Sequence, residues 1–454
     1  MDRHHPAPAD GDTIAAVATA TGRGGIGVVR VSGPASARIA TELLGSIPRP
    51  RHASLRSFRD AAGQAIDEGI VLFFPGPDSF TGEDVLELQG HGSPVVLDLL
   101  LARLLELGAR HARPGEFSER AFLNGRMDLA QAEAVADLIA SGSAGAARAA
   151  LRSMQGEFSR QVRTLVTQLV ALRVQVEAEI DFPDEDIDLP VAHQLQHDGQ
   201  KIRAAIAALL APARQGCLLQ EGVTVVLAGL PNSGKSSLLN TLAGHDRAIV
   251  SRIPGTTRDL LREQIEIDGL PVLLIDTAGL RESDDEIERE GVRRARAAMD
   301  EADHVLLLAD DSAAADPAAL AALLPPAVPR TLVRSKIDLS GRAPGAAAGG
   351  AGITEVAVSA LTGAGIDALR RHLARCAGVE GGGGPVFSAR RRHLDALGRA
   401  DRLIDAAVLQ LARYQIELAA EELRLAQQAL DEITGAFTTE DLLAEIFSGF
   451  CIGK

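Results

Sequence analysis

One stretch of the chain places glycines, a lysine and a hydroxyl in the order that phosphate binding requires. Residues Gly229 to Ser236 read G-L-P-N-S-G-K-S, which fits the pattern G-x-x-x-x-G-K-[ST]. Backbone N–H groups of such a loop wrap the phosphates, and the helix that follows adds positive potential at its N-terminus. The context fits, because Val223–Ala228 predicts a strand and Ser237–Leu242 predicts the start of a helix. We expect Lys235 to reach the β- and γ-phosphates and Ser236 to bind Mg²⁺.

Two further segments supply the rest of a phosphate site. Asp276 to Gly279 reads D-T-A-G after an apolar strand, so its carboxylate can hold Mg²⁺ through water. Its glycine lets a backbone N–H approach the γ-phosphate. Between the two motifs lies Pro254 to Asp259, in which either Thr256 or Thr257 could complete the Mg²⁺ shell. This middle segment is a weak signal alone and a strong one in this position.

The choice of base is indicated by Ser335 to Asp338, which reads S-K-I-D after a strand expected at Thr331–Val333. A carboxylate at Asp338 can accept two hydrogen bonds from the guanine edge, which adenine cannot offer. The usual first residue of this motif is Asn, whereas Ser335 is shorter and has no amide. Weaker guanine binding and a differently braced loop both stay open. Ser359-Ala360 fits the last guanine loop, and five elements in the correct order favour GTP over ATP.

The residue that orients the attacking water is less obvious. Many GTPases use a Gln directly after D-x-x-G, but this chain has Leu280, which can neither donate nor accept a hydrogen bond. Several acids follow between Glu282 and Glu290, with Glu288 among them. From the residues alone, a solvated acidic helix face is the better interpretation of any single one.

Composition limits the class of protein. The 454 residues are enough for two or three domains, and 46% of them are hydrophobic. The net charge of −15 argues against a chain whose whole surface clamps nucleic acid. Cys217, Cys376 and Cys451 lie too far apart in sequence for a disulfide framework or a zinc cluster, so we expect a reducing cytoplasm. No apolar run approaches a membrane span.

The order of elements predicts a multidomain fold. An α+β domain is expected over residues 1–125, with helical halves at 126–217 and 381–454 on either side of an inserted α/β P-loop GTPase domain at 218–380. A helix is expected at Val95–Leu107. Besides the strands named above, we expect strands at Thr13–Thr19, Ile26–Val31, Ile70–Phe74, Val85–Gln89, Val272–Ile275, His304–Leu308 and Val356–Val358. Ala343–Ile353 is expected to be a loose loop and Gly381–Gly384 a linker.

The chain resembles the MnmE (TrmE) family of tRNA modification GTPases over almost its whole length. Besides the nucleotide motifs, the resemblance rests on five blocks: Gly22 to Gly27, Phe80 to Asp84, Gln89 to Gly92, Pro114 to Ser118 and Phe450 to Lys454. The Cys-containing tail and the N-terminal blocks are the most specific, because they separate this family from other G proteins. A ribosome-assembly relative would carry an RNA-binding domain after the GTPase domain, where helices are expected here.

The resemblance implies a set of GTP and metal contacts. Glu288 matches the acid that positions the attacking water. The residues matched to GTP binding are Asn232, Ser233, Gly234, Lys235, Ser236, Ser237, Ser251, Arg252, Ile253, Pro254, Gly255, Thr256, Thr257, Asp276, Thr277, Ala278, Gly279, Ser335, Lys336, Asp338, Ser359 and Ala360. Ser236 and Thr257 match the Mg²⁺ ligands, and the K⁺ ligands match Asn232, Ser251, Ile253 and Thr256.

The resemblance also implies a one-carbon site in the N-terminal domain. Arg30, Glu87 and Lys454 match contacts to a tetrahydrofolate derivative, either 5-formyl or 5,10-methylene. Arg126 stands where the family usually has Lys, which keeps the charge but changes the geometry. Cys451 matches the tail cysteine that the family needs for modification.

The family's partners and chemistry follow from the same resemblance. It implies a homodimer, K⁺-stimulated GTP hydrolysis, and a complex with the flavoprotein MnmG that modifies carbon 5 of the wobble uridine in certain tRNAs. No membrane span and a cytoplasmic location are expected. A regulatory GTPase switch without modification chemistry, or a GTP-binding scaffold that barely hydrolyses, are the alternatives. Which tRNAs are modified, whether glycine or ammonia is the donor, and what Cys451 does chemically stay open.

Overall fold

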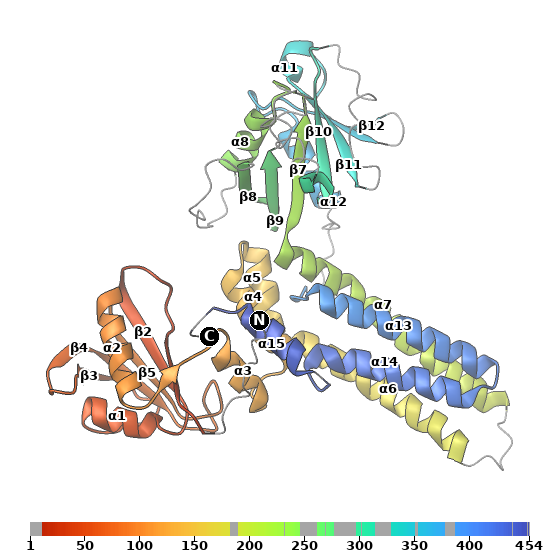
Figure 1. Cartoon of the computed structure of the whole chain (residues 1–454). Coiled ribbons are helices and arrows are strands. Elements are labelled where there is room, and N and C mark those ends of the chain that lie inside the picture. The colour runs from red at the N-terminus through yellow and green to blue at the C-terminus, as the bar shows by residue number, and fades with distance from the viewer. Residues whose placement is uncertain are drawn as a thin grey trace. The chain divides into compact units, whose positions relative to one another are not determined.

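The computed structural model describes residues 11–181, 189–230, 232–245, 261–267, 269–276, 297–300, 302–313, 328–349, 353–376, 386–437, 439–451 and 453. They form two compact units, of which one comprises Met1–Ala136 and Asp431–Lys454 and the other Asp137–Leu430 (Figure 1). Both ends of the chain therefore belong to the same unit.

The first unit contains a six-stranded sheet in the order β3-β4-β5-β2-β1-β6. Its strands are β1 (Ile14–Val17), β2 (Gly24–Ser32), β3 (Ser54–Arg59), β4 (Ala65–Phe74), β5 (Val85–Gly92) and β6 (Arg110–His111). Neighbours are antiparallel except β1 and β6. Val29 and Val31 of β2 are fully buried, whereas Arg30 between them points to the other face. The sheet core includes side chains of α1 (Ser36–Leu44) and α2 (Pro94–Glu106).

The end of the chain completes this unit. Its further helices are α3 (Glu116–Leu123), the start of α4 (Leu129–Ala140) and α15 (Glu440–Ser448), which all follow the sheet in sequence. Phe447 and Phe450 pack with Leu129 and Ala132 in one apolar cluster. Gly453 has a φ of +94° and leaves no room for a side chain, because a Cβ there would collide with the Val17 carbonyl. The tail therefore lies against the end of β1.

Long helices form the helical part of the second unit: α5 (Ala144–Met154), α6 (Glu157–Asp181), α7 (Leu189–Glu221), α13 (Arg391–Ala412) and α14 (Ile416–Thr434). Helices α7 and α13 pack side by side, although about 200 residues separate them (Figure 1). Gly199 of α7 allows this, since a Cβ there would lie 2.6 Å from Val408 of α13. Arg203 also pairs with Asp401 at 3.0 Å. The segments before and after the inserted domain thus build one helical domain.

One stretch of α7 satisfies the length and composition of a membrane span. His193–Glu221 has a mean hydropathy of 1.3 in its most apolar window, of which 39% is buried. Leu195, Ile202, Ile206 and Leu209 of this helix are buried inside the helical domain. A core helix passes the same test, so this one helix among the described residues is weak evidence for a membrane.

The inserted domain is a seven-stranded sheet in the order β12-β13-β11-β10-β7-β9-β8. Its strands are β7 (Val223–Gly229), β8 (Leu261–Ile267), β9 (Leu270–Asp276), β10 (His304–Asp310), β11 (Arg330–Ser335), β12 (Gly345–Ala348) and β13 (Thr354–Ala357). The five inner strands are parallel, and β8 and β12 are antiparallel edges. Its helices include α8 (Lys235–His245), α11 (Ile337–Ser340) and α12 (Ile366–Cys376).

The predicted fold class is confirmed, with one correction. All the strands expected from the sequence occur, with shifted ends, and the helix expected at Val95–Leu107 is α2. The expected loop at Ala343–Ile353 is wrong in part, because β12 pairs antiparallel with β13 there. Ladder bonds use only backbone groups, so an alanine run on an edge can form a strand without any apolar alternation.

Candidate functional site

The phosphate loop connects β7 to α8 in a conformation that its small residues permit. Gly229 has a φ of +151°, and a Cβ there would approach the Leu308 carbonyl oxygen to 2.5 Å. Gly234 has a φ of +91°, and Asn232 adopts the left-handed region with a φ of 63°. The loop therefore turns tightly at three positions and delivers Lys235 to the first turn of α8.

Lys235 and Asp276 form the charged floor of this loop. Lys235 is 7% exposed and donates to the carbonyl oxygens of Gly229 and Leu230, both at 3.0 Å. Burial lowers the pKa of Lys235, and the negative charge of Asp276 opposes that shift. The ammonium group is thus held by two carbonyl groups at the start of the phosphate loop, where it can reach bound phosphates.

Ser236 in the first turn of α8 and Asp276 at the end of β9 are brought together from different motifs. The Ser236 hydroxyl donates to Oδ2 of Asp276 at 2.8 Å. Asp276 is 7% exposed, and its second oxygen, Oδ1, is buried and lacks a hydrogen-bond partner among the described residues. A hydroxyl beside a carboxylate with a spare oxygen is a donor set that suits a hard cation such as Mg²⁺.

Ser335 has a specific place beneath the phosphate loop. It is 5% exposed, and its hydroxyl lies 2.7 Å from the Ser233 carbonyl oxygen and 3.2 Å from that of Ala309. The residue therefore connects the end of β11 to the phosphate loop and to β10. These contacts correspond to the differently braced loop, which was one of the two possibilities that the sequence left open for Ser335.

The other predicted base-recognition residues surround Ser335. Ser359 is fully buried and donates to Oδ1 of Asp338 at 2.6 Å, which holds that exposed carboxylate in place. Lys336 pairs with Asp310 at 2.7 Å. The Ala360 carbonyl accepts a hydrogen bond from Thr241 of α8 at 3.0 Å. These groups and the phosphate loop meet at the carboxyl ends of the parallel strands, where ligands bind in sheets of this class.

Several predicted residues lie outside the described residues. They are Ser251, Arg252, Ile253, Pro254, Gly255, Thr256, Thr257, Thr277, Ala278, Gly279, Glu288 and Lys454. Of the predicted GTP contacts, the structure brings together those of the phosphate loop, Asp276 and the two base loops.

In the first unit, Arg30 and Glu87 form a pair across the register of β2 and β5. Nε and Nη2 of Arg30 donate to Oε1 of Glu87 at 3.0 and 2.9 Å. The guanidinium lies 5.4 Å from the ring centre of Phe80 and 5.7 Å from that of Phe117. Arg126 is exposed and lies 3.7 Å from Asp78.

The tail brings Cys451 into the same unit as Arg30. The Cys451 side chain is exposed, and its carbonyl oxygen accepts from the Gly115 N–H at 3.4 Å. Phe117, two residues further along, is the ring next to Arg30. Of the predicted one-carbon contacts, Arg30 and Glu87 therefore lie on the sheet of the unit that also holds the predicted tail cysteine.

A buried ionic network around Glu116 escaped the sequence reasoning. Glu116 is fully buried, and its carboxylate pairs with Arg110 and Arg120. Burial disfavours the charged carboxylate, but hydrogen bonds from Arg110, the Arg113 N–H and Arg120 outweigh this and lower the pKa of Glu116 to about 2. Arg120 also reaches Glu83 at 3.0 Å. Glu116 and Arg120 have the i,i+4 spacing of a helical pair, but the contact with Glu83 spans 37 residues, so local spacing does not signal the whole network.

Comparisons with known proteins agree with this geometry. A family model described as the MnmE helical domain matches residues 129–451, and one described as the GTP-binding protein TrmE N-terminus matches residues 13–126. The tRNA modification GTPase MnmE of Pseudomonas paraeruginosa (strain DSM 24068 / PA7) is 56% identical over 450 residues, which cover 98% of this chain and 99% of the relative. The protein of that description from Alkalilimnicola ehrlichii (strain ATCC BAA-1101 / DSM 17681 / MLHE-1) is 59% identical over 444 residues, 97% and 99% of the two chains.

Among solved structures, Era of Aquifex aeolicus is 26% identical and covers 40% of this chain and 66% of its own, with a TM-score of 0.28, too low to bear on fold or function. The matches to the relatives run through both units and the inserted domain alike. The chain belongs to the MnmE family of tRNA modification GTPases.

Proposed function

We propose that this chain hydrolyses GTP to drive modification of carbon 5 of the wobble uridine in tRNA, together with the flavoprotein MnmG. The one-carbon donor is a 5-formyl or 5,10-methylene tetrahydrofolate. The observation that carries the proposal is the arrangement of the first unit. The tail lies against β1, and its Cys451 carbonyl accepts from Gly115 at the start of α3, while Phe117 of α3 contacts Arg30, the partner of Glu87. A GTPase switch without modification chemistry has no need of that arrangement.

At the phosphate loop, the chain's own residues bind and orient the nucleotide. Lys235 supplies positive charge to the β- and γ-phosphates, and Ser236 with Asp276 would hold Mg²⁺, whose charge offsets that of the phosphates. Asp338, fixed by Ser359, accepts the two guanine N–H donors. Ser335 keeps the loop closed from beneath. The proposed contacts of Ser251 to Thr257 and of Thr277 to Gly279, and the role of Glu288 in positioning water, remain predictions.

Potassium stimulation is part of the proposal. Asn232 is exposed and held by its left-handed backbone at the outer edge of the loop, so its amide oxygen can serve as a cation ligand. The remaining proposed ligands are Ser251, Ile253 and Thr256. The bound ion would offset charge that develops between the β- and γ-phosphates, the role an arginine finger has elsewhere. Paired GTPase domains in a homodimer would enclose it.

The face around Arg30 fits a pterin with a glutamate tail. A guanidinium can bind a carboxylate, a carboxylate can accept from pterin N–H groups, and the rings of Phe80 and Phe117 offer apolar surface. Arg126 and Lys454 would extend the positive charge. Cys451 is exposed within the same unit and is the proposed reactive group of the tail. A cytoplasmic location, where this thiol stays reduced, completes the proposal.

The decisive experiment is mass spectrometry of wobble uridines in tRNA from cells that lack the chain, followed by its restoration. Restoring the parent chain should return the carbon-5 modification, whereas Cys451→Ser should restore GTP hydrolysis but leave the uridine unmodified. Cys217→Ala, which removes a buried thiol from the helical domain, is the matched control and should behave as the parent. An unchanged uridine profile in the absence of the chain would favour the regulatory switch.

A further inference from the structure

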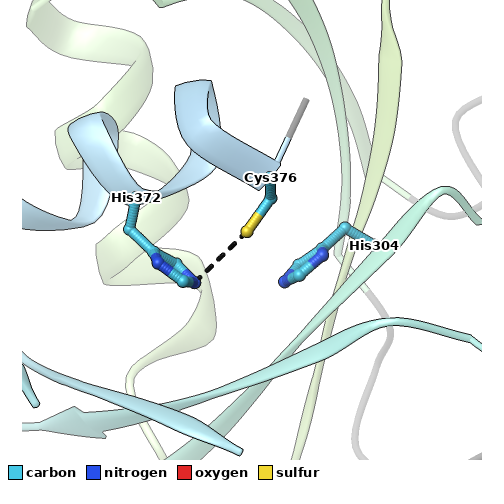
Figure 2. A group of neighbouring side chains, drawn as sticks. All are labelled: His304, His372 and Cys376. Atoms are coloured by element: carbon cyan, nitrogen blue, oxygen red, sulfur yellow. Dashed lines mark hydrogen bonds between the residues drawn. The ribbon is translucent and has the colours of Figure 1, made fainter. Parts of the chain in front are cut away.

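The inserted domain holds a second cluster of chemically capable side chains, built from segments far apart in sequence. His304 begins β10, whereas His372 and Cys376 lie on α12 (Figure 2). The Cys376 sulfur lies 3.4 Å from Nε2 of His372. One donor atom from each of the three residues lies within 4.8 Å of the others.

Both imidazoles are oriented by one hydroxyl. Oγ1 of Thr331 lies 2.8 Å from Nε2 of His304 and 2.6 Å from Nε2 of His372. A single hydroxyl can donate to one ring and accept from the other, so both rings can be neutral here. His304 and His372 are 5% and 7% exposed. Neutral imidazole is the form that binds metals.

The cluster is also open to small molecules. A cavity of about 450 Å³ is lined by His372, Arg375 and Cys376 of α12 and by residues of β12 and β13. A metal bound by three protein ligands beside such a cavity would keep a fourth position for water or another small ligand. A ring nitrogen that binds the metal can no longer hydrogen-bond to Thr331, so the Thr331 hydroxyl could occupy that fourth position.

This place is remote from the nucleotide. His304 is the first residue of β10 and Asp310, next to the base loop, is the last. The six steps between them span about 20 Å, at opposite ends of the sheet. An ion at the cluster would therefore not contact GTP or its Mg²⁺.

We propose that His304, His372 and Cys376 bind one zinc ion. Two imidazole nitrogens and a thiolate are the donor set of Zn²⁺ rather than of Mg²⁺ or K⁺. His372 and Cys376 are four residues apart, which places both on one face of α12 as a chelating pair. Binding replaces the thiol proton of Cys376 with the metal and releases that proton to solvent.

The distances between the three donor atoms need to change little to bind zinc. Tetrahedral zinc holds its nitrogen and sulfur ligands about 3.4 to 3.6 Å apart. The pair on α12 already has this spacing at 3.4 Å, and the widest separation, 4.8 Å at most, closes with a side-chain shift of about 1 Å. The bound ion would fasten the last turn of α12 to the start of β10, so it should stabilise the inserted domain.

The test is titration of the full chain, freed of any purification tag, with Co²⁺ as a coloured substitute for zinc. One equivalent should give the thiolate-to-cobalt charge-transfer band and the visible bands of a tetrahedral site, and one equivalent of Zn²⁺ should remove them. Oxygen sites such as the Mg²⁺ site cannot give a thiolate band. Zinc should also raise the unfolding temperature of the parent chain.

Variants assign the band to the cluster. Cys376→Ser should abolish it, and His372→Gln, which can still hydrogen-bond to Thr331, should weaken Zn²⁺ binding by more than about tenfold. Cys217→Ala and Cys451→Ser are matched controls and should keep the band. Absence of the band in the parent chain, its survival in Cys376→Ser, or failure of Zn²⁺ to displace cobalt would each overturn the proposal.

Discussion

Replacing Ser335 with alanine tests whether the brace beneath the phosphate loop contributes to GTP binding. Its hydroxyl has one hydrogen and two carbonyl acceptors, and the shorter contact, 2.7 Å, goes to Ser233 of the loop. The Ser335→Ala substitution removes this buried hydrogen bond, at a cost of about 1 kcal/mol, and of up to about 3 kcal/mol if the carbonyl stays dry. Since 1.4 kcal/mol corresponds to a factor of ten, GTP and GDP affinities should fall by about fivefold at the lower cost and by about a hundredfold at the upper one.

The measurement is the dissociation constant of a fluorescent guanine nucleotide, at fixed Mg²⁺ and K⁺, alongside the unfolding temperature. Ser335→Asn should bind at least as tightly as the parent, because an amide has two donors for the two carbonyls. Ser153→Ala is the matched control, since Ser153 is 1% exposed and donates to the Ser388 carbonyl at 2.8 Å in the helical domain. Unchanged affinity in Ser335→Ala, or an equal loss in Ser153→Ala, would refute the brace.

Three other substitutions probe separate parts of the chain. The pKa of Glu116 is about 2 in the folded chain against an ordinary 4.5, so the stability that its charge contributes is present above pH 4.5 and is lost as the pH falls towards 2. Glu116→Gln should therefore lower the free energy of unfolding at pH 7 by up to about 3 kcal/mol. The unfolding temperature of the variant should also fall less steeply with acid than that of the parent chain. Gly453→Ala should displace the tail from Val17 and abolish tRNA modification while sparing GTP hydrolysis, which paired assays would check. Asn232→Ala should remove K⁺ stimulation but keep nucleotide binding, and equal hydrolysis rates in K⁺ and Na⁺ for the parent chain would contradict this.

The sequence was most informative where function depends on local order. The phosphate loop was predictable because its glycines, lysine and serine are adjacent and lie between a strand and a helix, as β7 and α8 show. The inserted topology was also predictable, because helical periodicity stops before β7 and resumes at α13. The strand at Gly345–Ala348 was not, because alanine and glycine mark loops while an edge strand needs only backbone partners.

The rest of the site depends on contacts that only the folded chain creates. Nothing in the local sequence around Ser335 reveals that its hydroxyl faces Ser233, 102 residues earlier. Likewise, the spacing of the three cysteines argued against a zinc site, whereas folding brings His304 to within reach of two residues about 70 positions later. Sequence patterns therefore identify the parts of a site but not the long-range contacts that position them.

Long-range contacts also explain what two of the N-terminal sequence blocks do in the fold. Phe80 to Asp84 and Pro114 to Ser118 are separate in sequence, and the helix α3 links them, because it begins within the second block. Glu83 pairs with Arg120 of α3 at 3.0 Å, and Asn124 at the end of α3 donates to the Thr81 carbonyl at 2.7 Å. Through Gly115, whose φ of 69° leaves no space for a side chain beside Phe447 and Phe450, the same region holds the tail. These blocks therefore connect the face around Arg30 to Cys451, so that a change in either block should disturb both the one-carbon site and the tail while leaving the phosphate loop intact.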